Sequence, residues 1–207
     1  DLARQSEPFQ QPLQQPALRM LVLGDSTAVG TGASRPSASL AGLMAASHPR
    51  LHIDNQARDG ASWAGVLTQL PVLAPDAPRY DVVLIQAGGN DVIRLHKLDE
   101  VAADIERVVS RASALGRTVI LMPSGNVGNA PVFFAPLSWW MSARSRTLHR
   151  SVAAAAARHG ARYVKLYKGP KNDPFVQQEG LFAADGLHPS DAGYASWWVE
   201  LQKQAHL

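Results

Sequence analysis

The residues best suited to chemistry are a serine near the start of the chain and an Asp-x-x-His sequence near its end. Ser26 stands in Gly-Asp-Ser-Thr after a short apolar run, where a tight strand-to-helix turn would expose its hydroxyl. Asp185 precedes His188 by three residues, so its carboxylate can hold the imidazole Nδ1–H and turn Nε2 toward a nucleophile. We therefore predict that Ser26 attacks, His188 takes its proton and Asp185 orients the histidine. Each motif taken alone has a simpler interpretation: Ser26 could only cap the next helix, and an Asp-x-x-His sequence is more typical of a surface loop.

Two further loops could stabilise the negative charge that such an attack creates. Asn90 follows two glycines after another apolar run, and its side-chain amide can donate a hydrogen bond without carrying a charge. Gly60 follows a further predicted strand and can present a bare backbone N–H. Each loop alone is also an ordinary turn. The prediction depends on the fold bringing these loops together with the serine.

Strand-like and helix-like patterns alternate along the chain, which predicts a parallel sheet covered by helices on both faces. The expected strands are Met20–Gly24, Leu51–Asn55, Asp81–Gln86, Thr118–Met122 and Tyr163–Leu166. The expected helices are Ala38–Ser47, Ser62–Leu70, Val101–Leu115 closed by Gly116, Ser138–His159, and a last one from Ser190 or Asp191 to the C-terminus. The predicted fold class is a three-layer α/β/α sandwich with a central five-stranded parallel sheet. Ligands bind such sheets beyond the carboxyl ends of the strands.

The order Ser26, Gly60, Asn90, Asp185 and His188, with each residue after a strand or before the last helix, resembles that of the SGNH hydrolases, the GDSL-type esterases and lipases. The resemblance extends from the first predicted strand to the end of the chain. It implies a flavodoxin-like sandwich, ester hydrolysis without a cofactor, and the three catalytic roles given above. It also implies an oxyanion hole made by the Ser26 N–H, the Gly60 N–H and the Asn90 side chain. The first motif departs from the family in having threonine where leucine is usual.

Length and composition limit the other possibilities. The chain has 207 residues, enough for one α/β domain, which we place at residues 19–207 after a Gln/Pro-rich linker over residues 1–18. Lys and Arg number 20 against 17 Asp and Glu, so the charge gives no reason to expect nucleic acid as a partner. No run reaches the ~18–20 apolar residues of a membrane-spanning helix. The absence of cysteine excludes disulfides and thiolate chemistry, and the histidine spacing predicts no metal site.

The localisation and the oligomeric state are left open by the sequence. Either a signal or anchor segment upstream of Asp1 has been removed from an exported or tethered protein, or the terminus is that of an ordinary trimmed cytoplasmic chain.

The expected substrate is a small-molecule ester with a short to medium acyl chain. Large apolar side chains gather at Phe133, Phe134, Trp139 and Trp140, and together with Leu187 they are the candidate acyl-binding residues. The alternative is that they only pack the long loop onto the domain.

Other functions remain compatible with the same residues. A carbohydrate O-acetylesterase or an acyltransferase would use the same site. An FMN-binding flavodoxin-like protein could use the hydroxyl-rich loop after the first strand, but that reading leaves Asn90 and the Asp-x-x-His sequence unexplained.

Overall fold

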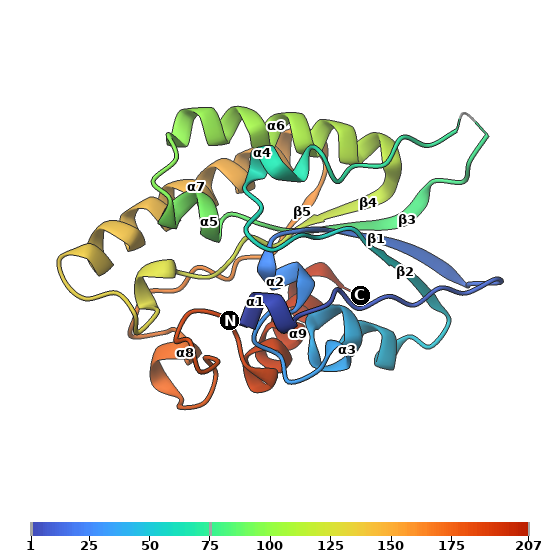
Figure 1. Cartoon of the computed structure of the whole chain (residues 1–207). Helices are drawn as coiled ribbons and strands as arrows, with labels where there is room; N and C mark the ends of the chain where they lie inside the picture. Colours follow the sequence, from blue (N-terminus) through green and yellow to red (C-terminus); the bar gives the residue numbers. More distant parts are fainter. Residues whose placement is uncertain (1, 75, 207) are drawn as a thin grey trace.

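The computed structural model describes residues 2–74 and 76–206 and is built around one parallel sheet (Figure 1). Its five strands lie in the order β2-β1-β3-β4-β5 and all pair in parallel. They are β1 (Leu18–Gly24), β2 (Leu51–Asn55), β3 (Tyr80–Gln86), β4 (Gly116–Leu121) and β5 (Arg162–Tyr163). This arrangement confirms the predicted fold class.

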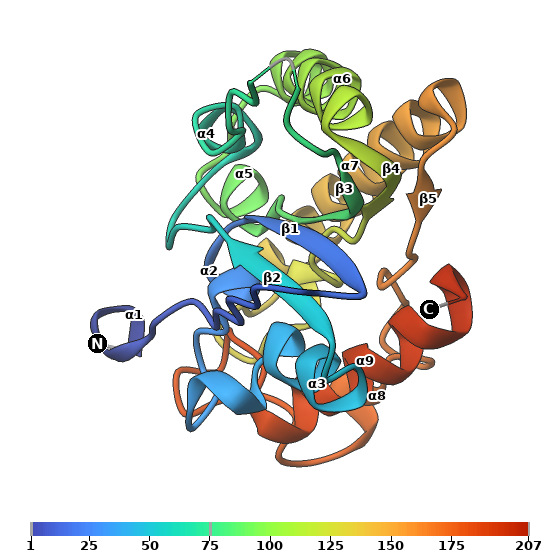
Figure 2. The ribbon, with the colours of Figure 1, turned by 90° about the vertical axis from the view of Figure 1, so that its right-hand side faces the viewer.

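Helices cover both faces of the sheet. The helices are α1 (Leu2–Gln5), α2 (Ser26–Val29), α3 (Leu40–Ser47), α4 (Trp63–Val66), α5 (Gly89–Ile93), α6 (Leu98–Leu115), α7 (Leu137–His159), α8 (Pro174–Gln177) and α9 (Asp191–Ala205), with 3₁₀ turns η1 (Pro36–Ala38) and η2 (Val127–Asn129). Figures 1 and 2 show α4, α5, α6 and α7 on one side of the sheet and α2, α3 and α9 on the other. Among the described residues, no helix is long and apolar enough to cross a membrane.

The alternation of side chains along the central strand explains the two layers of core. In β1, Leu21 and Leu23 point into the cluster beneath α6 and α7, whereas Met20 and Val22 point into the cluster beneath α3 and α9. All four are buried. A strand covered on both faces needs apolar residues at consecutive positions, which is why the run reads as continuous rather than alternating.

The predicted end of the helix that begins at Ser62 differs from the structure. Ser62 does cap α4, accepting a hydrogen bond from the Gly65 N–H, but the helix stops at Val66 instead of continuing to Leu70. The chain turns there and buries the Gln69 amide, which donates to the Gly24 carbonyl and accepts from its N–H, both at 2.8 Å. These two hydrogen bonds satisfy the backbone N–H and carbonyl of Gly24 at the end of β1. We attribute the early end of the helix to them.

Gly116 closes α6 directly after Leu115, as predicted. Its φ is −123°, an extended conformation, and it is the first residue of β4. A Cβ at this position would lie 2.6 Å from Val83 Cγ2, so close packing against β3 is what requires glycine here.

The predicted N-terminal linker is partly ordered against the sheet. Gln11 forms two backbone hydrogen bonds with Ile53, an antiparallel bridge beside β2. The Gln10 side chain donates to the Asn55 carbonyl at 2.7 Å and accepts from the Asn55 N–H at 2.9 Å. Because β2 is an edge strand, its outer backbone groups need partners, and the glutamines supply them. The segment has no helical or strand periodicity, so nothing in the sequence indicated this pairing.

Candidate active site

The nucleophile candidate lies in the turn between β1 and α2. Gly24 has a φ of +146°, and a Cβ there would lie 1.9 Å from the Gln86 carbonyl oxygen, so the turn tolerates only glycine. The buried Asp25 carboxylate caps α2 by accepting from the Thr27 N–H at 2.9 Å and the Thr27 hydroxyl at 2.7 Å. Ser26 is therefore held as the first residue of the short helix.

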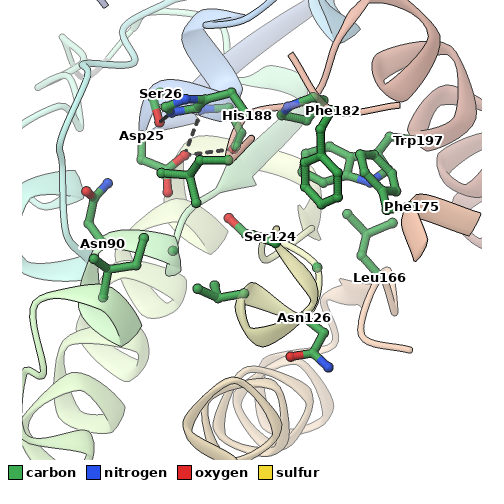
Figure 3. A pocket seen from close by; sticks show the side chains of 18 of the residues that line it. Asp25, Ser26, Asn90, Ser124, Asn126, Leu166, Phe175, Phe182, His188 and Trp197 are labelled. Carbon is green, nitrogen blue, oxygen red and sulfur yellow. Dashed lines mark hydrogen bonds between the residues drawn. The ribbon is translucent and has the colours of Figure 1, made fainter. Parts of the chain in front are cut away.

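The fold brings Ser26 next to the Asp-x-x-His sequence. The distance from Ser26 Oγ to His188 Nε2 is 2.9 Å, and that from His188 Nδ1 to Asp185 Oδ2 is 2.6 Å. Figure 3 shows the Ser26 and His188 side chains close together at one side of a pocket. The imidazole is thus placed to accept the serine proton on one nitrogen while the carboxylate holds the other.

The Asp185 carboxylate is fixed by its own loop. Its Oδ1 accepts hydrogen bonds from the backbone N–H groups of Leu187 and His188, both at 3.0 Å. Partial burial alone would raise the pKa of Asp185, but the hydrogen bonds from the His188 side chain and these two N–H groups outweigh it, so the pKa lies below its ordinary value. Asp185 is therefore ionised at neutral pH and can stabilise a positively charged His188.

The three predicted oxyanion-hole residues, Ser26, Gly60 and Asn90, line the same cavity. The Asn90 side-chain amide donates one of its two hydrogens to the Ala61 carbonyl at 3.1 Å, which orients the group and leaves the second hydrogen available. Gly60 has a φ of +73°, and Arg94 donates to its carbonyl at 2.8 Å. Within the described part of the chain, no acceptor is bonded to the N–H of Ser26 or of Gly60. The Ser26 and Gly60 N–H groups and the Asn90 amide are therefore donors available to a ligand in this cavity.

Two buried carboxylates lie behind these loops. Burial raises the pKa of Asp25 to about 6, although the two bonds from Thr27 oppose the rise. Burial likewise raises the pKa of Asp91, against hydrogen bonds from His96 and the Trp63 N–H. Asp25 bonds to the turn that carries the nucleophile, and Asp91 joins the Asn90 loop to α4. Both carboxylates therefore hold the geometry of the turns.

A cavity of about 200 Å³ begins at Ser26 and His188 and runs between α5, η2 and α9. Its far wall is apolar, and Figure 3 shows Leu166, Phe175, Phe182 and Trp197 gathered there. The Phe175 ring lies 5.0 Å from the Phe182 ring and 5.8 Å from the Trp197 ring, centroid to centroid. Such a wall can receive the apolar part of a ligand whose reacting carbon lies at Ser26.

The candidate acyl-binding residues divide between the cavity and the surface. Leu187 lines the cavity, but Phe133, Phe134, Trp139 and Trp140 do not. Phe133 packs against the core cluster beneath α6 and α7, and the other three are exposed, Phe134 just before α7 and Trp139 and Trp140 in its first turn. The prediction that these four aromatic residues line the acyl-binding cavity is therefore corrected. One of the four rings packs into the core, and the other three lie exposed on the surface.

The residues of the apolar wall were missed because nothing local marks them. Leu166 and Phe182 lie on loops, Phe175 lies in α8 and Trp197 in α9, and only the fold brings them together. Ser124, just after β4, also lines the cavity, and the rule that ligands bind beyond the strand ends could have found it.

A parallel α/β/α sandwich with serine, histidine and aspartate joined at the carboxyl end of its sheet is the architecture of a serine-type hydrolase. The chain matches the GDSL-like Lipase/Acylhydrolase family over residues 22–196, and it belongs to that family. It is thus a carboxylic ester hydrolase, which confirms the resemblance found in the sequence. No curated protein matches the chain in sequence.

Solved structures share the fold. TesA is 24% identical with a TM-score of 0.69, over 90% of this chain and 97% of that one. Axe2, an acetylxylan esterase from Geobacillus stearothermophilus, is 21% identical with a TM-score of 0.61, over 93% and 95%. The psychrotrophic esterase EstA from Pseudoalteromonas is 17% identical with a TM-score of 0.68, over 91% and 96%.

Proposed function

We propose that this protein hydrolyses esters of short to medium acyl chains through an acyl-enzyme formed on Ser26. The observation that carries the proposal is the pair of hydrogen bonds joining Ser26 Oγ to His188 Nε2 and His188 Nδ1 to Asp185. The FMN-binding alternative is set aside, because Ser26 is bonded to His188 and the chain belongs to a hydrolase family.

The proposed reaction proceeds in two halves. Ser26 Oγ forms a bond to the acyl carbon while its proton passes to His188 Nε2, and the oxyanion is stabilised by the donors of Ser26, Gly60 and Asn90. The bond to the alcohol oxygen then breaks as His188 protonates the leaving group. Water next attacks the acyl carbon, giving up a proton to His188, and the acid departs as the proton returns to Ser26.

The dimensions of the cavity support the preference for short to medium acyl chains. The aromatic rings of Phe175, Phe182 and Trp197 bound the space beyond Ser26, so an acyl tail meets a wall after a limited length. Each buried methylene contributes about 0.8 kcal/mol, but only while the cavity extends to receive it. The chain-length profile of kcat/KM should therefore peak early and fall.

The test is a p-nitrophenyl ester series from acetate to palmitate, with wild-type protein and Ser26→Ala. Ser26→Ala should lower turnover by on the order of 10³-fold or more, judging from other serine triads. Ser124→Ala, which changes another serine of the same cavity, is the matched control and should retain the fold and much of the activity. A folded Ser26→Ala protein with wild-type turnover would disprove the proposal, and activity still rising at the longest chains would disprove the chain-length preference.

A carbohydrate O-acetyl ester remains a specific second candidate, because one structural neighbour is described as an acetylxylan esterase. Acetylated sugars belong in the same assay. Product analysis with and without an alcohol acceptor separates hydrolysis from acyl transfer.

A further inference from the structure

An exposed apolar surface lies beside the active site and takes no part in the cavity. It consists of Val132, Phe134, Leu137, Trp139 and Trp140, which we call the apolar rim. The exposed fractions of Phe134 and Trp139 are 77% and 71%, unusual for side chains of this size. Large aromatic groups left in water at one place usually mark a binding surface.

The apolar rim adjoins the loop that carries Asp185 and His188. A Cβ on Gly186, the residue after Asp185, would lie 3.2 Å from the Val132 side chain. Ala130, two residues before Val132, lines the cavity itself. Figure 1 shows the start of α7 at the end of the molecule toward which the strands run. A partner bound to the rim would therefore lie next to the loop that carries Asp185 and His188, beside the cavity.

The outer face of α7 continues the rim with positive charge. Trp139, Ala143, Arg146 and Arg150 follow the helical spacing i, i+4, i+7 and i+11, and all four are exposed. The helix carries four arginines and no acidic residue, and residues 107–172 contain 11 Lys and Arg and no Asp or Glu. In the described chain, no carboxylate pairs with Arg146 or Arg150. The rim and this arginine stripe (Arg146 and Arg150) form one surface, which is apolar at the start of α7 and positively charged farther along the helix.

From this surface we infer that the protein docks on an anionic lipid bilayer. The rim would enter the headgroup region, where tryptophan is favoured, and the stripe would lie over acidic headgroups. A symmetric dimer through the same face would bring each arginine stripe close to its copy and is therefore disfavoured. A nucleic acid would match the arginines but would leave the aliphatic groups of Val132 and Leu137 without an apolar partner. Docking would present the mouth of the site to esters held at the lipid surface.

The direct test is co-sedimentation with vesicles, which needs no catalytic activity. The wild-type protein and Ser26→Ala should bind equally to phosphatidylcholine vesicles that contain about one third phosphatidylglycerol, and only weakly to phosphatidylcholine alone. Binding should weaken in about 1 M NaCl, where charges are screened beyond about 3 Å. Since binding is read independently of hydrolysis, a failure here is distinct from a failure of the proposed reaction.

Two sets of variants separate the contribution of the arginine stripe to vesicle binding from that of the apolar rim. The double variant Arg146→Gln/Arg150→Gln should bind anionic vesicles about thirty-fold more weakly, while Arg35→Gln/Arg50→Gln, equal in charge but on the opposite side of the sheet, should bind as wild type. The rim variant Phe134→Ser/Trp139→Ser/Trp140→Ser should lose at least about tenfold, against Val72→Ser/Val199→Ser as the exposed apolar control. All should keep the wild-type rate on a soluble short-chain ester.

Four results would overturn the inference. They are no sedimentation with anionic vesicles at low salt, equal losses in the control variants, a solution dimer that the rim variant dissociates, and binding to single-stranded RNA in place of vesicles.

Discussion

The buried carboxylate next to the nucleophile gives a quantitative prediction for stability. Asp25 is 1% exposed, and burial raises its pKa from 3.8 to about 6. Between these two values the folded protein binds a proton that the unfolded chain releases, so the free energy of unfolding falls as the pH rises. Each pH unit is equivalent to about 1.4 kcal/mol, so the fall amounts to about 3 kcal/mol and is complete above pH 6.

Asp25→Asn should remove this pH dependence. The asparagine keeps a carbonyl oxygen that can accept from the N–H and hydroxyl of Thr27, but it carries no charge to bury. We expect the variant to match the wild type near pH 3, below both pKa values, and to exceed it by about 3 kcal/mol at pH 7 to 8. Urea unfolding at a series of pH values measures the difference, with Asp76→Asn, an exposed carboxyl, as the control. A difference that is constant with pH, or a variant less stable at pH 7, would refute the reasoning.

Three further predictions concern the site. Asn90→Ala should lower kcat by roughly 10²-fold with little change in KM, because its amide acts mainly on the oxyanion; a KM effect alone in steady-state kinetics would make it a substrate-binding residue. Arg94→Ala should lower kcat by roughly tenfold by releasing the Gly60 peptide that it holds, and Arg94→Lys should restore part of the loss; unchanged kinetics would show that the Gly60 N–H needs no such support. Phe182→Ala should move the optimum of the p-nitrophenyl ester series to longer acyl chains, and an unmoved optimum would show that this ring does not limit the cavity.

The elements of the fold could be predicted because their signals are local. A parallel strand buried on both faces is a continuous apolar run, so β2 was placed residue for residue and β1, β3 and β4 within two residues at each end. The short β5 is Arg162–Tyr163 instead of Tyr163–Leu166: the Val164 N–H still donates to the Leu121 carbonyl at 2.9 Å, but the pairing with β4 ends there, although Val164 and Leu166 are buried. Buried residues outside a strand give the same apolar sequence pattern as residues of a paired strand.

The candidate site also contains residues that the sequence could predict and residues that it could not. Ser26, Asp185 and His188 could be proposed because each belongs to a short motif whose chemistry is specific, and the fold does bring them within hydrogen-bond distance. The apolar wall around Phe182 could not, because its residues come from two loops, α8 and α9, and only tertiary packing brings these together. Trp139 illustrates the opposite error, since a large aromatic side chain near a site reads as pocket lining even when the structure leaves it exposed.

The central claim is that Ser26 is the nucleophile, and a fluorophosphonate probe followed by intact-mass and peptide mapping tests it directly. The cavity contains a second serine, Ser124, with a buried hydroxyl that bonds to no group of the described chain, so the experiment offers its own internal comparison. The account predicts one phosphonyl group per chain, on Ser26, with none on Ser124 and none in Ser26→Ala. A label on Ser124, or labelling that persists in Ser26→Ala, would contradict it.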